Sequence, residues 1–546
     1  MGTPDLILKN GRIATLATDP AQPDFVEALA VRNGKVVAIG AESDLPAAGR
    51  DTAVYDLGGR TAIPGVIDSH VHFVRAGRTW DDEVRWENMF TLADALASLA
   101  QRALEIPTGK WIRVIGGWDE KQFAEGRGPT REELDEAAPD HPVYVQMQYT
   151  YVVLNSLGMK EIGILGDTAE ARVIDSEFPQ GFQRSADGKL TGRAGGGPLM
   201  TWFYRQLPMP TLEEQTAGTI SLSREFARLG MTGAIDGGGL STGPEAYRAI
   251  SKANISGDLK TKVRLFKHAT RPGAEATDFD GYFRFDSPRF GDEMLRFSGI
   301  GEIIMYRSHD RIAEPADYSD EAMAENKEVM MNAAEHGWSV QVHAHQREFI
   351  DKILAVWEEI DRVHSIKDLR WGFVHAELMH AGDAERLNRL GAGVLFQSLL
   401  RLNGDEAIVA WGADQISHAP ELNLLWDAGV PIGLGSDAMR VASYNPWTSL
   451  QWFITGLTIR GTRTLADEHL LTRERALRGY TQGGAWFTFE EKERGQLVPG
   501  FAADIAVLSD DYFSMPVENI QHIVSHLTVV DGEVAHDDDS VMRLTR

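Results

Sequence analysis

The hydrophobic pattern of the chain differs between its two ends and its middle. Near the ends, short apolar stretches flank turn dipeptides, as in DLILKNGRIATL at 5–16, ALAVRNGKVVAIG at 28–40 and HLTVVDGEVAH at 526–536. Two apolar stretches joined by Asn-Gly or Asp-Gly predict a β-hairpin. We therefore expect a hairpin in each of these segments, and a further strand over DIAVL at 504–508.

In the middle of the chain, apolar strand-like runs alternate with longer helical segments. Eight such runs begin near residues 66, 231, 263, 302, 340, 371, 394 and 432. Amphipathic periodicity predicts helices between them, for example over 219–230 and 348–360. This alternation predicts a parallel sheet, and eight units of this kind predict a (β/α)8 TIM barrel. The fold class is therefore α/β.

One interval between the predicted barrel strands is too long for a single helix. It spans residues 74–218, after the first strand, and we interpret it as an insertion that covers the barrel mouth. It contains the turn signal Asp187-Gly188 and seven aromatic residues suited to that position, namely Trp80, Trp86, Trp111, Trp118, Phe123, Tyr149 and Tyr151. The simpler interpretation is that most of these rings form the insertion's own core.

The charge balance limits the partners that the protein can bind. The chain has 54 Lys and Arg against 80 Asp and Glu, a net charge of −26. This charge repels a phosphate backbone and an anionic membrane surface, so neither nucleic acid nor membrane is an expected partner. No apolar run approaches the roughly 18 residues that span a bilayer. The N-terminus lacks a signal-peptide pattern, which predicts a cytoplasmic protein.

The chain contains no cysteine. Disulfides, thiolate zinc sites and cysteine nucleophiles are therefore excluded. Any metal ion must be bound by histidine and carboxylate side chains.

Histidine and aspartate residues lie at the ends of four predicted barrel strands. His70 and His72 are two residues apart in the first strand, and the period of a strand places both on one face. His343 ends the fifth strand, His375 the sixth and Asp437 the eighth. Because barrel enzymes build their active sites at the carboxyl ends of the strands, we expect these side chains to converge on a metal site.

Several motifs carry a resemblance to a known family. They are PGVIDSHVHF at 64–73, RWGFVHAE at 370–377, GLGSD at 433–437 and PGFAADIAVL at 499–508. These motifs resemble the amidohydrolase superfamily, and within it the amidohydrolase-3 branch of metal-dependent hydrolases, with YtcJ-like proteins and N-substituted formamide deformylases. GGWDEKQF and PTREELDEAAPDHPV in the insertion also resemble that branch, so the likeness extends over nearly the whole chain.

The resemblance implies a domain organisation. Such families pair the barrel with a small β-sandwich assembled from both chain ends. Here residues 1–63 and 498–546 would form the sandwich, and the terminal hairpins fit that role. Residues 64–497 would form the metal-dependent barrel, with the insertion at 74–218. A small-molecule substrate is expected, and a homodimer is one option for the assembly.

The resemblance also implies a set of metal ligands. His70, His72 and Asp437 would bind one ion, and His343 and His375 would bind a second or shared ion. The expected cofactor is therefore one or two divalent ions, with zinc as the expected metal.

Two positions depart from the pattern of the family. At the predicted fourth strand many relatives have a carboxylated lysine that bridges two metals, whereas this chain has GIGEIIMY with Glu302. A glutamate can bridge two cations but is shorter than a lysine carbamate, so a hydrogen-bonded Glu302 away from the metal is the alternative. After His343, relatives often have Gly-Asp and this chain has HAHQRE. We favour a supporting or packing role for His345 over ligation.

The ligand set supports hydrolysis by a metal-bound hydroxide but does not select the bond, because amides, ureas, cyclic amides and some esters pass through similar tetrahedral intermediates. With the resemblance, the leading hypothesis is hydrolysis of a non-peptide C–N bond of the amide type. Asp437 would take the proton of the water and deliver it to the leaving nitrogen, while a metal or a histidine stabilises the oxyanion. Asp437 and His375 are therefore the candidate catalytic residues. One alternative is a mononuclear zinc deaminase, in which His70, His72, His343 and Asp437 bind one ion and His375 orients the hydroxide. Another is a catalytically silent metal-binding or regulatory protein.

Overall fold

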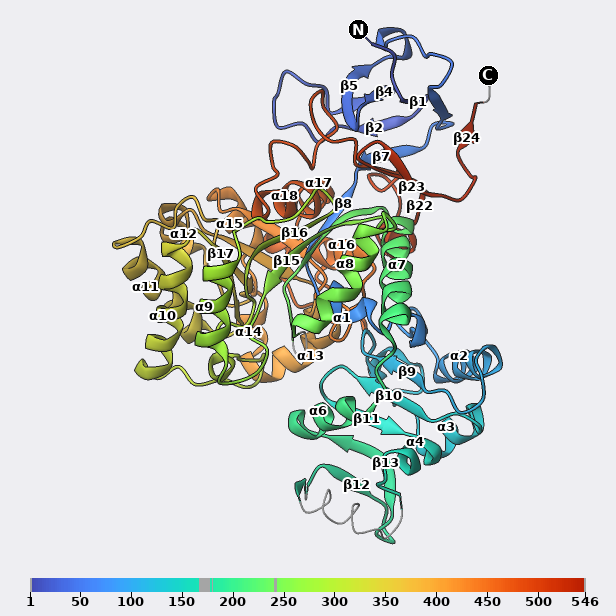
Figure 1. The fold of residues 1–546 in the computed structure, drawn as a ribbon, viewed down its shortest axis with the longest axis vertical. Helices are drawn as coiled ribbons and strands as arrows, with labels where there is room; N and C mark the ends of the chain where they lie inside the picture. The colour runs from blue at the N-terminus through green and yellow to red at the C-terminus, as the bar shows by residue number, and fades with distance from the viewer. Residues whose placement is uncertain (1, 166–176, 179, 240–242, 545–546) are drawn as a thin grey trace.

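The computed structural model describes residues 2–165, 177–178, 180–239 and 243–544. Three parts follow one another along its longest axis (Figure 1). Two small sheets that contain both chain ends lie at the top, the barrel lies in the middle, and a further five-stranded sheet lies at the bottom.

Eight parallel strands form a nearly closed barrel, which confirms the α/β fold with a (β/α)8 barrel. The strands are β8 (Val66–Val71), β14 (Met231–Asp236), β15 (Lys262–Lys267), β16 (Leu295–Ile300), β17 (Ser339–Ala344), β18 (Gly372–His375), β19 (Gly393–Gln397) and β20 (Ile432–Gly435). They are ordered around the barrel as they are along the chain. This arrangement brings the carboxyl ends of all eight strands to one face.

Helices cover the outside and the two ends of the barrel. They are α1 (Phe73–Gly77), α7 (Leu212–Arg228), α8 (Tyr247–Ile255), α9 (Glu275–Phe285), α10 (Asp320–Glu335), α11 (Arg347–Asp361), α12 (Ala384–Leu390), α13 (Leu400–Trp411), α14 (Ala413–Ile416), α15 (Leu422–Asp427), α16 (Pro446–Thr455), α17 (Arg473–Arg478) and α18 (Gly484–Phe487). Their starts follow local chemistry. At α7, for example, Thr211 accepts from the N–H of Glu214, whose side chain accepts from the N–H of Thr211, a capping box.

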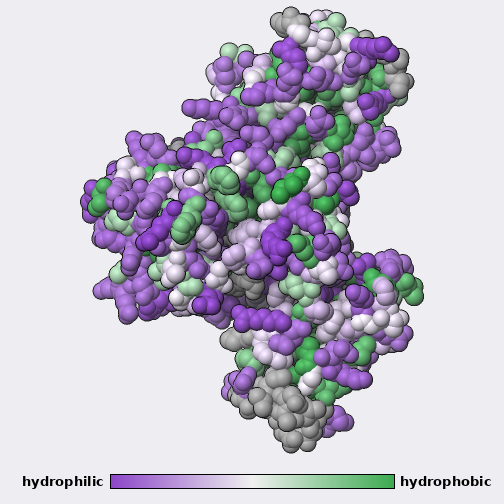
Figure 2. Space-filling view, in the orientation of Figure 1, coloured by the Kyte–Doolittle hydropathy of each residue, from purple (hydrophilic) through white to green (hydrophobic). Residues whose placement is uncertain are grey.

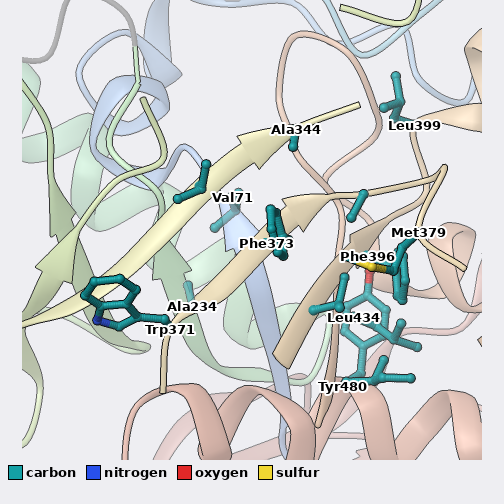
Figure 3. Packing of buried hydrophobic residues seen from close by; sticks show 14 of the residues in the cluster. Val71, Ala234, Ala344, Trp371, Phe373, Met379, Phe396, Leu399, Leu434 and Tyr480 are labelled. Carbon is teal, nitrogen blue, oxygen red and sulfur yellow. The ribbon is translucent and has the colours of Figure 1, made fainter. Parts of the chain in front are cut away.

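The alternation of each strand separates an apolar outer face from an inner face. In Figure 3, Val71, Phe373, Phe396 and Leu434 come from different strands and pack in the cluster beneath the helices. The residue next to an outward apolar position points into the barrel, as His70 does beside Val71. The hydrophobic pattern that forms the core therefore also directs polar side chains to the barrel interior.

Two sheets at the chain ends pack face to face around an apolar cluster that includes Leu8, Ile13 and Ile505. One sheet contains β1 (Leu6–Lys9), β4 (Ala28–Arg32), β5 (Lys35–Gly40), β6 (Ala53–Asp56) and β24 (Met542–Arg543). The other contains β2 (Arg12–Ala14), β3 (Phe25–Val26), β7 (Thr61–Pro64), β21 (Ile505–Leu508), β22 (Ser525–Val530) and β23 (Glu533–Asp537). The small β-sandwich is thus built from both ends of the chain.

One of the three expected hairpins is wrong. β4 pairs with β5 and β22 pairs with β23 as expected, but β1 and β2 belong to different sheets. A two-residue type I′ hairpin turn needs positive φ at both central residues. Asn33 and Gly34 have φ of 51° and 74°, whereas only Asn10 of the Asn10-Gly11 pair is positive, at 53°. The chain at Asn10-Gly11 therefore crosses from one sheet to the other.

The fourth barrel strand lies earlier than the apolar pattern predicts. The pattern places it from Glu302 onward, but β16 ends at Ile300 and the chain then continues as a loop. Ile303 and Ile304 are buried in that loop, so the apolar sequence of the loop resembles that of a strand. Gly301, with φ 137°, leaves the strand, and Glu302 follows its carboxyl end.

The long insertion after the first barrel strand forms its own sheet. Its strands are β9 (Ile112–Ile115), β10 (Val143–Met147), β11 (Tyr151–Leu154), β12 (Phe182–Arg184) and β13 (Leu190–Gly195), with helices α2 (Leu92–Glu105), α3 (Arg131–Ala137), α4 (Ser156–Glu161) and α6 (Gly197–Gln206). Trp86, Trp118, Phe123 and Tyr151 pack in the core of this part. The simpler interpretation therefore holds for most of the rings, while Tyr149 faces the barrel cavity.

The surface in Figure 2 is mostly hydrophilic, with scattered apolar residues. Among the helices that the structure describes, none combines the length and the apolar character needed to cross a membrane.

Candidate metal centre

The six side chains predicted to bind metal lie together at the carboxyl end of the barrel. They are His70 in β8, His72 after it, Glu302 after β16, His343 in β17, His375 at the end of β18 and Asp437 after β20. Each of the six residues is more than nine-tenths buried. Residues far apart in the sequence thus share one buried polar cluster.

His70 and His72 face the two carboxylates. His70 Nε2 lies 3.4 Å from Glu302 Oε2 and 3.6 Å from Asp437 Oδ1. His72 Nε2 lies 3.1 Å from Asp437 Oδ1 and 3.6 Å from Glu302 Oε1. Although His70 is fully buried, neither of its ring nitrogens has a hydrogen-bond partner in the part of the chain that the structure describes. A buried imidazole of this kind requires another partner.

His343 and His375 face the same carboxylates from the other side of the barrel. His343 Nδ1 lies 3.1 Å from Glu302 Oε2. His375 Nε2 lies 3.7 Å from Glu302 Oε2 and 3.8 Å from Asp437 Oδ2. Asp437 therefore directs Oδ1 at His70 and His72 and Oδ2 at His375.

These separations fit a shell of donors around a cation. Two ligands of a tetrahedral zinc ion, each about 2.1 Å from the metal, lie roughly 3.4 Å apart. The distances between the imidazole nitrogens and carboxylate oxygens range from 3.1 to 3.8 Å. Histidine and carboxylate together also make up the donor chemistry that divalent zinc accepts. The residues present therefore fit a divalent metal.

Backbone carbonyls orient two of the imidazoles. His72 Nδ1–H donates to the carbonyl of Gly238 at 2.9 Å, which leaves Nε2 facing the carboxylates. His343 Nε2–H donates to the carbonyl of Asp310 at 3.0 Å, which leaves Nδ1 facing Glu302. Such hydrogen bonds fix the tautomer and the ring orientation of a ligand.

Glycines after β14 make room for the imidazoles, and the pattern of ligand residues alone misses them. A Cβ on Gly237 would lie 2.3 Å from His70 Cε1, and one on Gly239 would lie 2.7 Å from His72 Nδ1. The signal in the sequence is the Gly237-Gly238-Gly239 run directly after a predicted strand.

Asp68 is a second residue that the ligand pattern misses. It is fully buried, accepts from the N–H groups of His70 and Ser436 at 3.1 and 3.0 Å, and accepts from Ser436 Oγ at 2.6 Å. Burial raises the pKa of Asp68 to about 6, although these donors oppose the shift. The carboxyl group links the first and last barrel strands beside two of the candidate ligands.

His345 lies beside the six-residue cluster. Its Nδ1–H donates to Glu377 Oε2 at 2.7 Å, and its ring lies 4.3 Å from that of His375 at 25°. Burial would lower the pKa of His345, but Glu377 raises it to about 9. On the other side, the ring of His309 stacks on His343 at 4.1 Å. These side chains surround the imidazoles of His343 and His375.

The electrostatics of the cluster suit a cation. Burial alone would lower the pKa of His70, but Glu302 and Asp437 raise it to about 10. The imidazoles in turn hold the pKa values of both carboxyl groups well below their usual range, against the effect of burial. Burial, with His345 and His343, lowers the pKa of His375 to about 4. His375 is therefore neutral at pH 7, the form that binds a metal.

The candidate metal centre opens into a cavity of about 420 Å³. Besides the candidate ligands, its walls include the hairpin at 148–150 of the insertion, Arg75 from α1, and Arg440 from the loop after β20. This volume suits a small molecule.

Sequence comparison identifies relatives over the full length of the chain. An N-substituted formamide deformylase from Arthrobacter pascens is 24% identical over 98% of this chain and 98% of its own length. The putative amidohydrolase YtcJ from Bacillus subtilis (strain 168) is 23% identical over 94% of this chain and 96% of its own.

Structure comparison finds the same fold in an uncharacterized metal-dependent hydrolase from Pyrococcus horikoshii OT3. That chain aligns with a TM-score of 0.66 and 19% sequence identity, over 94% of this chain and 99% of its own. The model of the amidohydrolase family matches residues 53–536. The chain therefore belongs to the amidohydrolase family and is a hydrolase of the class that acts on carbon–nitrogen bonds other than peptide bonds.

Proposed function

We propose that this protein hydrolyses an amide-type C–N bond of a small molecule with the help of two divalent cations held at the six-residue cluster. The observation that carries the proposal is the buried shell of four imidazoles and two carboxylates at separations of 3.1 to 3.8 Å, with no hydrogen-bond partner among the described residues for either ring nitrogen of His70. Six donors exceed the four that one tetrahedral zinc ion needs.

Glu302 is proposed as the bridge between two metal positions. Its Oε1 faces His72, and its Oε2 faces His70, His343 and His375. A carboxylate that lies between the imidazoles on the two sides of the barrel suits a ligand shared by two ions. The first position would use His70, His72 and Asp437 as further ligands, and the second would use His343 and His375.

Asp437 and His375 are the cavity residues proposed to act in the hydrolysis itself. A divalent cation bound here would lower the pKa of a water molecule toward neutrality and polarise the scissile carbonyl. Asp437 would accept a proton from the attacking water and return it to the leaving nitrogen, and its Oδ2, which faces His375, is the atom assigned to that transfer. His375, neutral at pH 7, would bind a cation and lie beside the developing oxyanion.

The identity of the relatives supports an amide as the reacting group. The relative from Arthrobacter pascens carries the name N-substituted formamide deformylase. Formamides are amides, and their hydrolysis passes through the tetrahedral intermediate that a preorganised electrostatic site stabilises. We propose N-formyl, N-acyl and cyclic amides as the classes to examine first.

The test combines metal counting with a turnover screen. Purified protein would be analysed for zinc and other divalent ions, and assayed on N-formyl, N-acyl and cyclic amides before and after chelation. We expect bound zinc, turnover of at least one amide class, and loss of both on chelation. Full turnover after complete metal removal would refute the proposal. Turnover of an aminated heterocycle with release of ammonia, and of no amide, would favour the mononuclear deaminase.

Asp437→Asn tests the proposed proton transfer within this screen. The amide oxygen can still bind a cation, but the group cannot accept the proton from water. We expect part of the metal to remain and kcat to fall on the order of 10²-fold or more, the usual scale of general acid–base catalysis. A kcat within a few-fold of the parent value would contradict the role of Asp437.

A further inference from the structure

Two arginines share the cavity with the candidate metal centre. Arg75 lies in α1, directly after the strand that carries His70, and Arg440 lies three residues after Asp437. Both are almost completely buried, with 7% and 8% of their surface exposed. Among the residues that the structure describes, neither side chain forms an ion pair with a carboxylate within 4.0 Å, although the guanidinium group of arginine carries a positive charge in proteins.

The partner that these guanidinium groups share is a phenol. Arg75 Nη1–H donates to Tyr149 Oη at 3.2 Å. The guanidinium carbon of Arg440 lies 5.7 Å from the centre of the Tyr149 ring and 4.4 Å from that of Tyr204. Burial raises the pKa of Tyr149, but Arg75 and Arg440 outweigh it and lower that pKa. Both guanidinium groups thus lie beside the side chain of Tyr149.

A third arginine of the cavity, Arg311, is paired with a carboxylate, as is usual for arginine side chains. Arg311 Nη1 lies 3.5 Å from Glu314 Oε2, and both side chains are exposed at the cavity rim. Its charge is balanced by a carboxylate and by water. Arg75 and Arg440 lie deeper and have no such compensation among the described residues.

Two buried carboxylates in this region, Asp437 and Asp236, serve other partners. Asp437 lies within 3.6 Å of His70 and His72, and Asp236 accepts from the N–H groups of Val74 and Gly238 at 2.6 and 2.7 Å. Burying a charge without a partner is unfavourable. A guanidinium group offers paired donors that match the two oxygens of a carboxylate. The cavity therefore has the chemistry of a site for an anionic group of a ligand.

We propose that Arg75, Tyr149 and Arg440 form a subsite that binds a carboxylate of the substrate, so that the substrates are amides with a free carboxylate, such as N-acyl amino acids. This inference rests on the proposed amide hydrolysis and adds the substrate class to it. The three residues come from α1, from the insertion hairpin and from the loop after β20. The insertion thereby contributes directly to substrate choice.

Two matched pairs of compounds test the subsite on the metal-loaded protein. The first pair, 3-phenylpropanoate and 3-phenylpropan-1-ol, lacks a C–N bond, so calorimetric titration measures binding without turnover. The second pair, N-acetylphenylalanine and N-acetylphenylalaninamide, measures kcat and KM. We expect the carboxylate of the first pair to bind roughly 10-fold or more tighter, as expected for charge-assisted hydrogen bonds, and the carboxylate of the second pair to show a lower KM.

Substitutions then assign the preference to the proposed residues. Arg75→Gln and Arg440→Gln should each raise KM for N-acetylphenylalanine roughly 10-fold, with a much smaller change for the amide, while Arg75→Lys should keep part of the preference. Arg311→Gln removes one positive charge from the cavity rim, and this variant should keep the full preference for the carboxylate compound. Thermal unfolding of each variant separates misfolding from loss of the subsite, and Arg75→Lys keeps the test usable if Arg75→Gln does not fold.

The results distinguish this inference from the proposed function. Equal binding of 3-phenylpropanoate and the alcohol to the parent protein would overturn the subsite, even if amides are hydrolysed. A preference for the carboxylate that survives in Arg75→Gln and Arg440→Gln would also overturn it, because the carboxylate would then bind elsewhere, for example at the metal. If no amide is hydrolysed, the proposed function fails while the binding arm still decides the subsite.

Discussion

The backbone N–H of Asp437 donates to the carbonyl oxygen of His70 across 2.8 Å. One residue follows the last barrel strand and the other lies in the first, so this bond spans the place where the barrel closes. The same two residues carry side chains of the candidate metal centre. The geometry of that centre therefore depends on how well the barrel closes.

Asp68 is the residue through which this dependence can be tested. Its carboxylate accepts three hydrogen bonds, from the N–H groups of His70 and Ser436 and from Ser436 Oγ. In Asp68→Asn an NH2 group replaces one of the two accepting oxygens, and this group then faces a hydrogen-bond donor of His70 or Ser436. We expect zinc affinity to fall about 10- to 100-fold, the usual effect of losing a residue that orients ligands, as measured by competition with a chelator.

Ser436→Ala provides the graded control for Asp68→Asn. It removes one of the three donors and leaves the carboxylate and both backbone bonds in place. We expect a smaller loss of zinc affinity than in Asp68→Asn. Parent-like affinity in Asp68→Asn would show that closure and metal binding are independent.

Gly237→Ala tests the space around His70. A Cβ at this position would lie 2.3 Å from His70 Cε1, so the imidazole or the loop after β14 must move. We expect the variant to fold and to bind less metal per chain, with activity reduced in the same proportion. The measurements are elemental analysis, turnover and thermal unfolding.

Gly281→Ala is the matched control for Gly237→Ala. Gly281 lies in helix α9, has no positive φ, and a Cβ there would meet nothing within 4 Å. Alanine in a helix interior is favoured over glycine by about 1 kcal/mol, so this variant should keep its metal and be at least as stable as the parent. Full metal content in Gly237→Ala would contradict the steric argument.

Much of the fold could be predicted from the sequence, because apolar periodicity and turn residues determine local structure. The barrel and the hairpins at Asn33-Gly34 and Asp531-Gly532 follow from such local signals. Asn10-Gly11 could not be placed, because the same dipeptide adopts a different φ when the chain changes sheet. Which sheet a strand joins depends on tertiary packing.

Only some residues of the candidate site could be placed from the sequence. Strand alternation places His70 and His343 inside the barrel, because Val71 and Val342 beside them pack outward. His375 does not follow that rule, since Val374 before it already faces the inner cluster. A φ of 71° at His375 accompanies its turn toward Glu302, and the sequence does not indicate that backbone conformation. Asp68 and the glycines after β14 act through three-dimensional contacts that no ligand spacing indicates.

Glu302→Gln tests the proposed bridge between two ions. Glutamine removes a negative charge shared by both cations, and its NH2 group cannot bind a metal. We expect tightly bound metal to fall from about two ions per chain toward one, because His343 and His375 then provide few ligands for the second position. Metal counting after removal of loosely bound ions measures this change.

The result for Glu302→Gln must be compared with the parent protein. A parent that holds a single ion, with the same number in the variant, would refute the bridge and favour the mononuclear alternative. Equal counts of two in both proteins would instead show that Glu302 supports the site without binding metal.

At the opposite end of the barrel from the candidate metal centre, buried ion pairs connect the barrel to the β-sandwich. Arg494 Nε lies 2.7 Å from Asp504 Oδ2, and Arg494 Nη1 lies 3.4 Å from Glu490 Oε2. Lys262 and Arg264 from β15 pair with the same two carboxylates, at 3.3 and 2.6 Å. All of these side chains are buried, so each charge depends on its partners.

Arg494→Met should therefore destabilise the protein by about 3 kcal/mol at pH 7, the scale of a buried pair that loses one partner. Burial would raise the pKa values of Glu490 and Asp504, but Arg494 and the pairing cations of β15 hold both below their usual range. Groups with lowered pKa values contribute stability above the unfolded value of about 4, and this contribution disappears as the pH falls through their folded values.

The difference in stability between the parent and Arg494→Met should accordingly be largest near neutral pH and shrink below about pH 4. Thermal unfolding at pH 7, 5 and 3 measures it. Arg307→Met is the control, because Arg307 pairs with Asp317 at the surface and should cost less than about 1 kcal/mol. An equally small loss in Arg494→Met, or a difference that grows toward low pH, would mean that this buried network does not hold the sandwich on the barrel.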